Sequence, residues 1–161
     1  MSGRLPDPKL TRLYRLEATL GEPIELGEVR GERRRIAPLT GGTFDGTFDG
    51  TDLSGELAAG PNADWQTILP DGTTLGDIRY TLATSGGALL AVRSQSIRHG
   101  SPEVLARLAR GDEVDAAEYT FRANTRIESA SPEFDWVNKG IFISVGGRLP
   151  SAVVYETYLV G

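Results

Sequence analysis

Short segments with a two-residue repeat, separated by turn residues, run through most of this chain and restrict what it can fold into. In residues 10–20 every second side chain falls on the same face. Period two is the repeat of a β-strand. One face carries Arg12, Tyr14, Leu16, Ala18 and Leu20, and the other carries Leu13, Arg15, Glu17 and Thr19.

Further segments of the same kind follow, and tight turns connect them. Pro70-Asp71-Gly72 and Ser85-Gly86-Gly87 have the residues of hairpin turns. The 20 glycines and 9 prolines stand between apolar runs rather than in one tract, which is typical of turns. The expected strands are residues 33–39, 65–69, 77–84, 88–96, 119–127, 136–145 and 152–160.

Only one helix is indicated, shortly after the strand expected over residues 88–96. Ser101 is a good N-cap, Pro102 suits the first helical position, and Gly111 ends the segment. Val104, Leu105 and Leu108 form its narrow apolar stripe. Many strands and one short α-helix predict a mainly β fold, a single antiparallel β-barrel or a strongly curved sandwich.

The length of 161 residues and an apolar fraction of 39% predict one domain with one core. We expect residues 1–9 to be a flexible leader and residues 10–161 to form the single domain. No stretch approaches the roughly 18 apolar residues of a membrane span, and residues 1–9 lack the apolar core of a signal peptide. These observations predict a cytoplasmic protein.

Composition also limits the chemistry. The chain has no Cys and one His, which excludes thiol chemistry and leaves too few ligands for a usual zinc site, so no metal is predicted. No glycine-rich phosphate loop or dinucleotide fingerprint follows a strand and opens a helix, so no cofactor is predicted. The net charge of −5 argues against nucleic-acid binding. Arg33-Arg34-Arg35, the only basic run, is interpreted as a solvated strand edge.

A tandem repeat, Thr43-Phe44-Asp45-Gly46 and Thr47-Phe48-Asp49-Gly50, admits two interpretations. Asp45, Asp49, Gly50 and Glu56 occupy places of an EF-hand calcium loop, but neither flank is a helix. The favoured interpretation is a pair of glycine-spaced strand segments that bend sharply at a barrel wall.

Six segments occur in the order seen in the small bacterial and fungal proteins called DUF3237, also named UPF0311, which this chain resembles. The segments are 31–44, 63–65, 77–82, 98–100, 119–122 and 136–138. The resemblance implies a lipocalin-like or calycin-like antiparallel barrel and homo-oligomers, for which we expect a dimer. Two positions depart from the family pattern, with Pro61-Asn62 and Ser96 in places where glycine is usual.

The segment around Asp64 offers candidate chemistry. Asp64 and Trp65 follow a turn, and an indole against a carboxylate would raise its pKa and suit it to proton transfer. The alternative is a turn-capping Asp beside a core Trp. Asp77 and Arg79 share one strand face, so they hold a substrate if that face is inward, and form a surface ion pair if it is outward.

Other candidates lie further along the chain. Trp136 and Asn138 share a predicted strand face with Phe142 and would line a ligand cavity or a core. Tyr119 and Phe121 repeat that pattern, and the phenol of Tyr119 could act as an acid. Arg98 is favoured over His99 as a functional residue, because no nucleophile-elbow motif supports a Ser-His site.

These residues predict a cofactor-independent isomerase, lyase or cyclase acting on a hydrophobic carbonyl-bearing small molecule in the barrel. Asp64 is the expected acid/base, and Arg79, Asn138 or Tyr119 would stabilise charge on oxygen. Trp65, Asp77, Arg98, Phe121, Trp136 and Asn138 are the expected substrate-binding residues. The alternative is a non-catalytic lipocalin-like binding protein, and a third possibility is an oligomer whose interface contains Trp136.

Overall fold

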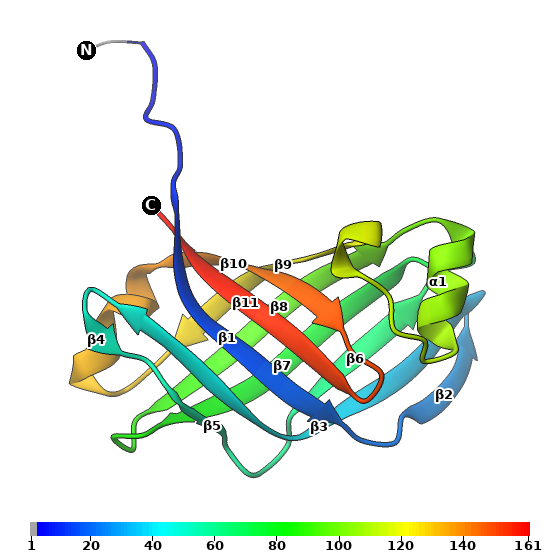
Figure 1. Ribbon diagram of the computed structural model, residues 1–161, viewed down its shortest axis with the longest axis horizontal. Helices are drawn as coiled ribbons and strands as arrows, with labels where there is room; N and C mark the ends of the chain where they lie inside the picture. The colour runs from blue at the N-terminus through cyan, green and yellow to red at the C-terminus, as the bar shows by residue number, and fades with distance from the viewer. Residues whose placement is uncertain (1–2) are drawn as a thin grey trace.

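A computed structural model describes residues 3–161, and antiparallel strands make up most of it (Figure 1). The first two residues of the expected leader lie outside the described residues, and Gly3–Lys9 are exposed and outside any strand. The eleven strands are β1 (Leu10–Leu20), β2 (Ile24–Val29), β3 (Glu32–Phe48), β4 (Thr51–Asp52), β5 (Gly55–Leu57), β6 (Ala63–Ile68), β7 (Thr74–Thr84), β8 (Leu89–His99), β9 (Thr120–Glu128), β10 (Ile141–Arg148) and β11 (Ala152–Val160).

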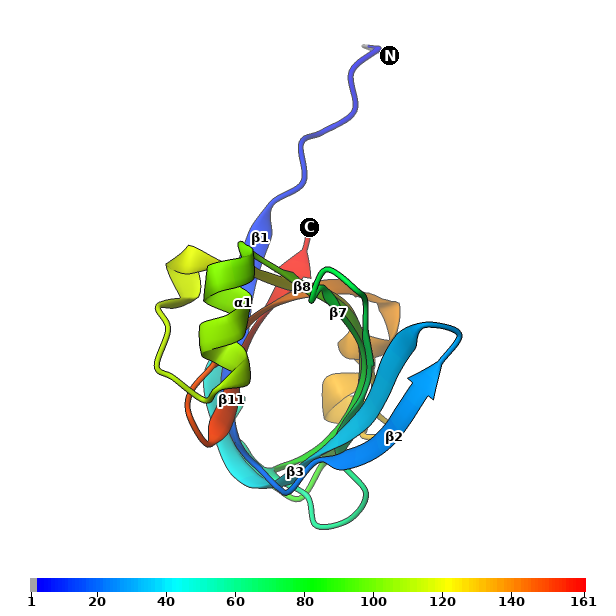
Figure 2. The same ribbon diagram turned by 90° about the vertical axis from the view of Figure 1, so that its right-hand side faces the viewer.

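The hydrogen-bonded ladders close on themselves. Neighbouring strands follow the order β1-β11-β10-β9-β8-β7-β5-β3-β2, and β1 pairs with β3 as well as with β11. β6 bridges β3 and β7 where β5 ends. The prediction of a mainly β, antiparallel fold is therefore confirmed, and Figure 2 shows the strands as a ring seen from the end that carries the helix.

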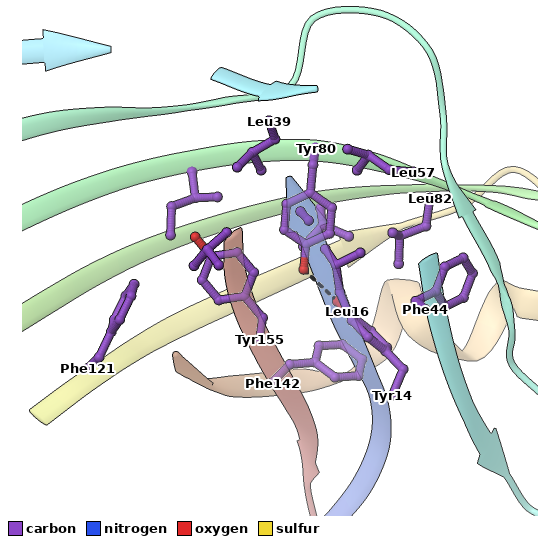
Figure 3. Packing of buried hydrophobic residues seen from close by; sticks show 14 of the residues in the cluster. Tyr14, Leu16, Leu39, Phe44, Leu57, Tyr80, Leu82, Phe121, Phe142 and Tyr155 are labelled. Carbon is purple, nitrogen blue, oxygen red and sulfur yellow. Dashed lines mark hydrogen bonds between the residues drawn. The ribbon is translucent and has the colours of Figure 1, made fainter. Parts of the chain in front are cut away.

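Side chains on alternate positions fill the interior of the ring. In β1, Tyr14, Leu16 and Ala18 are buried on one face, as their shared face in the two-residue repeat allows, but Arg12 of the same expected face is exposed and Leu13 is buried. A β-bulge between Arg12 and Tyr14 causes this exchange, because one extra residue switches the faces. Figure 3 shows the aromatic part of the core, in which the Tyr14 and Tyr80 hydroxyls lie 2.8 Å apart.

The tandem repeat continues β3 and then turns. Asp49 and Gly50 have φ of 50° and 75° and join β3 to β4 as a two-residue hairpin. At Gly46 a Cβ atom would overlap the backbone of Leu13, so glycine lets β1 and β3 approach here. Arg30-Gly31 makes a second such hairpin, between β2 and β3, which the sequence analysis did not predict.

The predicted helix is present as α1 (Pro102–Ala109). Ser101 caps it by accepting a hydrogen bond from the Val104 backbone N–H, and Val104, Leu105 and Leu108 are buried. A short 3₁₀ helix, η1 (Ala116–Glu118), follows. None of the helices within residues 3–161 is long and apolar enough to cross a membrane.

The prediction of one strand over residues 136–145 is wrong in its first part. Residues Pro132–Lys139 form a 3₁₀ helix, η2, and β10 begins only at Ile141. Pro132 fits a helix start, and Phe134 and Val137, three residues apart, are both buried. In Figure 1, η2 and α1 lie at opposite ends of the ring.

Candidate functional site

Polar side chains enter the ring at the α1 end. Along the inward face of β8 the residues change from Leu90 and Val92 to Ser94, Ser96 and Arg98. The inward face of β10 changes in the same direction, from Phe142 to Arg148, and both changes run toward α1. Convergence of several strands therefore gives one end of the ring a charged interior.

A cavity in two parts lies there, which we call the chamber. Its narrow inner pocket, of about 20 Å³, is lined by Asp64, Gln66, Ser96 and Arg98 among others. Its wide vestibule, of about 740 Å³, lies under α1 and shares Arg98 and Arg148 with the pocket. The pocket has room for about one water-sized group, and the vestibule for a small molecule.

Asp64 is the carboxylate of the inner pocket, and a hydrogen bond holds its side chain at only one of the two oxygens. It is 5% exposed, and its Oδ2 accepts a hydrogen bond of 2.8 Å from Gln66 Nε2. Gln66 Oε1 in turn accepts a bond of 2.6 Å from Arg35 Nε. Asp64 Oδ1 has no hydrogen-bond partner among residues 3–161. The arrangement thus fixes the carboxylate while leaving one buried oxygen available.

Burial raises the pKa of Asp64 from 3.8 to about 6. The hydrogen bond from Gln66, the charges of Arg98 and Arg35 and the nearby backbone of Asp77 lower the pKa, but desolvation is the larger effect. A carboxyl with this pKa can accept and return a proton near neutral pH. The expected raised pKa is therefore present, but its cause is burial and not Trp65, which is 41% exposed on the outer face.

Arginines dominate the remaining charge of the chamber. Arg98 is 9% exposed; burial and then the charges of Arg148 and Arg35 lower its pKa to about 10. Its Nη2 donates only a long bond of 3.5 Å to Thr74 Oγ1. Burial likewise lowers the pKa of Arg35 and of Arg148. The interpretation of 33–35 as a solvated edge is wrong for Arg35, because β3 lies between β2 and β6 and Arg35 lines the vestibule.

One predicted aromatic residue lines the chamber, a second contacts the backbone of a chamber arginine, and Tyr155, which the sequence analysis did not identify, lines the inner pocket. Phe121 lines the inner pocket, as expected of a substrate-binding residue. The Tyr119 hydroxyl is buried and accepts a 2.8 Å hydrogen bond from the backbone N–H of Arg148, so it holds the end of β10. Tyr155 also lines the pocket and stacks at 6.0 Å on Tyr80, where burial raises its pKa well above 10.0.

The predicted pair Asp77 and Arg79 does not join Asp64. The two form an exposed ion pair of 3.4 Å on the outer face of β7, with side chains 43% and 51% exposed. Ile78, Tyr80 and Leu82 occupy the inward face instead, because the apolar side of a strand faces the core. The surface alternative is thus the one realised, and Arg79 and Asp77 lie outside the chamber.

Trp136, Asn138 and His99 also lie away from the chamber. Trp136 stacks on Phe48 at 3.9 Å at the opposite end of the ring. Asn138 holds a loop, accepting from the Ser129 N–H and donating to the Ser129 carbonyl, both at 2.9 Å. These positions follow from η2, which replaces the expected strand. His99 is exposed, with Nδ1 2.9 Å from Thr73 Oγ1.

Gly76 makes room for the carboxylate. A Cβ atom at this position would lie 2.8 Å from Asp64 Oδ1 and would overlap Ser96 Oγ. Ser96, one of the two departures from the family pattern, therefore occupies the wall directly beside Asp64. At the other departure, Asn62 fixes the approach to β6 by donating 2.8 Å to the Ala58 carbonyl and accepting 2.9 Å from the Thr81 N–H.

The fold and the chamber define a class of antiparallel β proteins with a polar cavity at one end. The family model described as "Protein of unknown function (DUF3237)" matches residues 8–160. UPF0311 proteins of Rhodopseudomonas palustris and Bradyrhizobium diazoefficiens are each 30% identical over 148 residues, covering 92% of this chain and 94% and 93% of theirs. The chain belongs to the DUF3237 (UPF0311) family, which confirms the resemblance.

Solved structures agree in fold. A conserved protein of unknown function from Rhodopseudomonas palustris superposes with a TM-score of 0.89 at 29% identity, over 98% of this chain and 100% of that one. A β-barrel-like protein from Acinetobacter baumannii gives 0.84 at 34% identity, over 99% and 100%. An enzyme from Penicillium herquei gives 0.71 over 100% of both chains, and at 16% identity that likeness concerns the fold alone.

Proposed function

We propose that this protein is a cofactor-independent enzyme, an isomerase, lyase or cyclase, acting on a carbonyl-bearing small molecule inside a calycin-like barrel. The observation that carries the proposal is Asp64, a buried carboxylate of which one oxygen has no hydrogen-bond partner among residues 3–161, in the inner pocket of a cavity large enough for a ligand. Titratable groups at functional sites commonly have pKa values shifted by burial in this way.

Asp64 Oδ1 is the proposed general base. It takes a proton from the carbon next to the substrate carbonyl, and negative charge then develops on the carbonyl oxygen. Arg98, which faces the same pocket, stabilises that oxygen in place of the predicted Arg79. Return of the proton to another carbon completes an isomerisation, and loss of a leaving group from the β-carbon completes an elimination.

Gln66 and Arg35 are the proposed positioning residues. Their two hydrogen bonds, of 2.8 Å and 2.6 Å, hold Oδ2 and leave Oδ1 without a hydrogen-bond partner among residues 3–161. The charged groups facing Asp64 are Arg35 from β3, Arg98 from β8 and Arg148 from β10. We therefore expect kcat/KM to fall below about pH 6, where Asp64 becomes protonated.

Proton exchange tests the proposal without knowledge of the natural substrate. Enolisable ketones, 2-oxo acids and 1,3-diketones are incubated with the protein in D₂O, and deuterium incorporation beside the carbonyl is followed by NMR. We expect exchange above the buffer rate, and a loss of about 100-fold or more in Asp64→Asn. The matched control is Asp77→Asn, which removes an exposed carboxylate of the outer face and should leave the rate unchanged.

The second candidate is a carrier that binds such molecules without converting them. The apolar lining of the vestibule by Leu20, Ile68, Leu105 and Leu108 favours it, since these residues provide affinity alone. A carrier gives no exchange above the buffer rate with any compound that binds. Exchange that is equally fast in Asp64→Asn would exclude Asp64 as the base.

A further inference from the structure

The chamber holds more positive than negative charge. Arg35, Arg98 and Arg148 line it, and Asp64 is its one buried carboxylate. Glu22 and Asp71 lie at the exposed rim of the vestibule. At that rim Arg33 is already paired with Glu25 at 2.6 Å. The excess is local, because the whole chain carries a net charge of −5.

The three chamber arginines lack counter-ions within the part of the chain that the structure describes. None of their guanidinium nitrogens lies within 4.0 Å of a carboxylate oxygen of residues 3–161. The Nε groups of Arg98 and Arg148 are buried and have no hydrogen-bond partner there. Buried or half-buried cations without counter-ions are costly to the fold, so their presence in a cavity indicates an anion that binds them.

The form of the chamber restricts that anion. The inner pocket, at about 20 Å³, admits only one or two heavy atoms beside Asp64, whereas the vestibule, at about 740 Å³, admits the body of a ligand. The planar guanidinium group of arginine can donate two parallel hydrogen bonds to the two oxygens of a carboxylate. The apolar residues Leu20, Ile68, Leu105 and Leu108 suit a hydrophobic chain or ring.

We propose that the substrate is a hydrophobic oxo acid, bound as its carboxylate. Arg148 and Arg35 hold the carboxylate, and the carbonyl oxygen enters the inner pocket at Arg98 beside Asp64. This assignment rests on the proposed function in one respect, since it places the ligand in the same chamber. It adds that the ligand must carry a negative charge.

A matched pair of ligands tests the charge. Calorimetry compares 2-oxo-4-phenylbutanoate with 4-phenylbutan-2-one, which has a methyl group in place of the carboxylate. We expect the acid to bind roughly tenfold more tightly or better, and this preference to weaken with added salt. Arg148→Gln and Arg35→Gln should each remove most of the preference. The control Arg93→Gln, which removes an exposed arginine of the outer face, should keep it.

Equal affinities for the two compounds, or no measurable binding of the acid at millimolar concentration, overturn the inference. A preference that survives both chamber substitutions overturns it as well, and Arg148→Lys, which keeps the charge, distinguishes lost charge from lost folding. Asp64→Asn separates the two proposals. If this variant exchanges protons as fast as the wild type but still prefers the acid, the general base is wrong and the oxo-acid assignment stands.

Discussion

The two ends of the ring are built from the same strands but filled in opposite ways. At the η2 end, Phe134, Val137 and Phe142 are buried and Trp136 stacks on Phe48. At the α1 end, the same ring encloses Asp64 and guanidinium groups that form no ion pair with any of residues 3–161. The contrast shows a division of labour: hydrocarbon burial at one end supplies stability, and the other end keeps buried charge that costs stability and is suited to chemistry.

The largest expected effect lies at the apolar end. Phe142→Ala removes a side chain that is 1% exposed, beside Trp136 at 6.4 Å. We expect the free energy of unfolding to fall by about 3–5 kcal/mol, because a cavity replaces the phenyl group of Phe142. Urea unfolding measures this, and the folded variant should retain ligand binding at the chamber. A loss of binding in the folded variant would show that the two ends are coupled.

Asp64→Asn should have the opposite effect on stability. The folded-state pKa of Asp64, about 6, lies above its ordinary 3.8, so between these values the folded state binds more protons than the unfolded state. The stability that Asp64 contributes is therefore present at low pH and is lost as pH rises through about 6. For a pKa shift of this size, ionisation of Asp64 in the folded state lowers the free energy of unfolding by about 3 kcal/mol.

We expect Asp64→Asn to raise the free energy of unfolding at neutral pH by up to about 3 kcal/mol, while removing proton exchange. The wild type should lose stability between about pH 4 and pH 7, and the variant should not show this decline. Urea unfolding at several pH values measures both curves, with Asp77→Asn as the control. An Asp64→Asn variant that is less stable than the wild type at neutral pH contradicts a desolvated carboxylate.

Tyr119→Phe tests whether Tyr119 belongs to the structural support of the chamber or to its chemistry. The phenol accepts a 2.8 Å hydrogen bond from the Arg148 backbone N–H, so its loss should cost about 1 kcal/mol of unfolding free energy. Since this bond positions Arg148, we expect KM for an acidic substrate to rise while kcat stays nearly constant. A large fall in kcat with KM unchanged would instead make Tyr119 a catalytic acid, as its sequence context suggested.

Much of the ring could be predicted from the sequence, because the residue pattern of most strands is visible within the strand itself. The period-two repeat located most strands, and Ser101-Pro102 gave the start of α1. The inward faces were left open in the sequence analysis, although β8 carries a signal for its own, since Leu90, Val92, Ser94, Ser96 and Arg98 change steadily from apolar to charged. Following that change to the strand ends would have found Arg148 on β10 in the same way.

The rest of the site depends on tertiary arrangement. Arg35 and Gln66 belong to the chamber only because β3 and β6 pair in a register that places Arg35 opposite Gln66. That register is set by closure of the ring and not by either strand. The error over Trp136 and Asn138 has a different origin, because residues 132–139 mix apolar and polar side chains over too short a length for their spacing to distinguish a strand from a 3₁₀ helix.

The smallest expected effect lies on the outer face. Arg79→Gln breaks the exposed 3.4 Å pair with Asp77, and surface pairs of this kind contribute about 0–1 kcal/mol. It also relieves repulsion, because Arg79 lies opposite Arg93, which lies opposite Arg126 across the next pair of strands. We therefore expect a near-zero change in unfolding free energy and an unchanged exchange rate, measured beside Arg148→Gln. A loss of exchange in Arg79→Gln would mean that the outer wall takes part in function, and the division between the two ends would then describe stability alone.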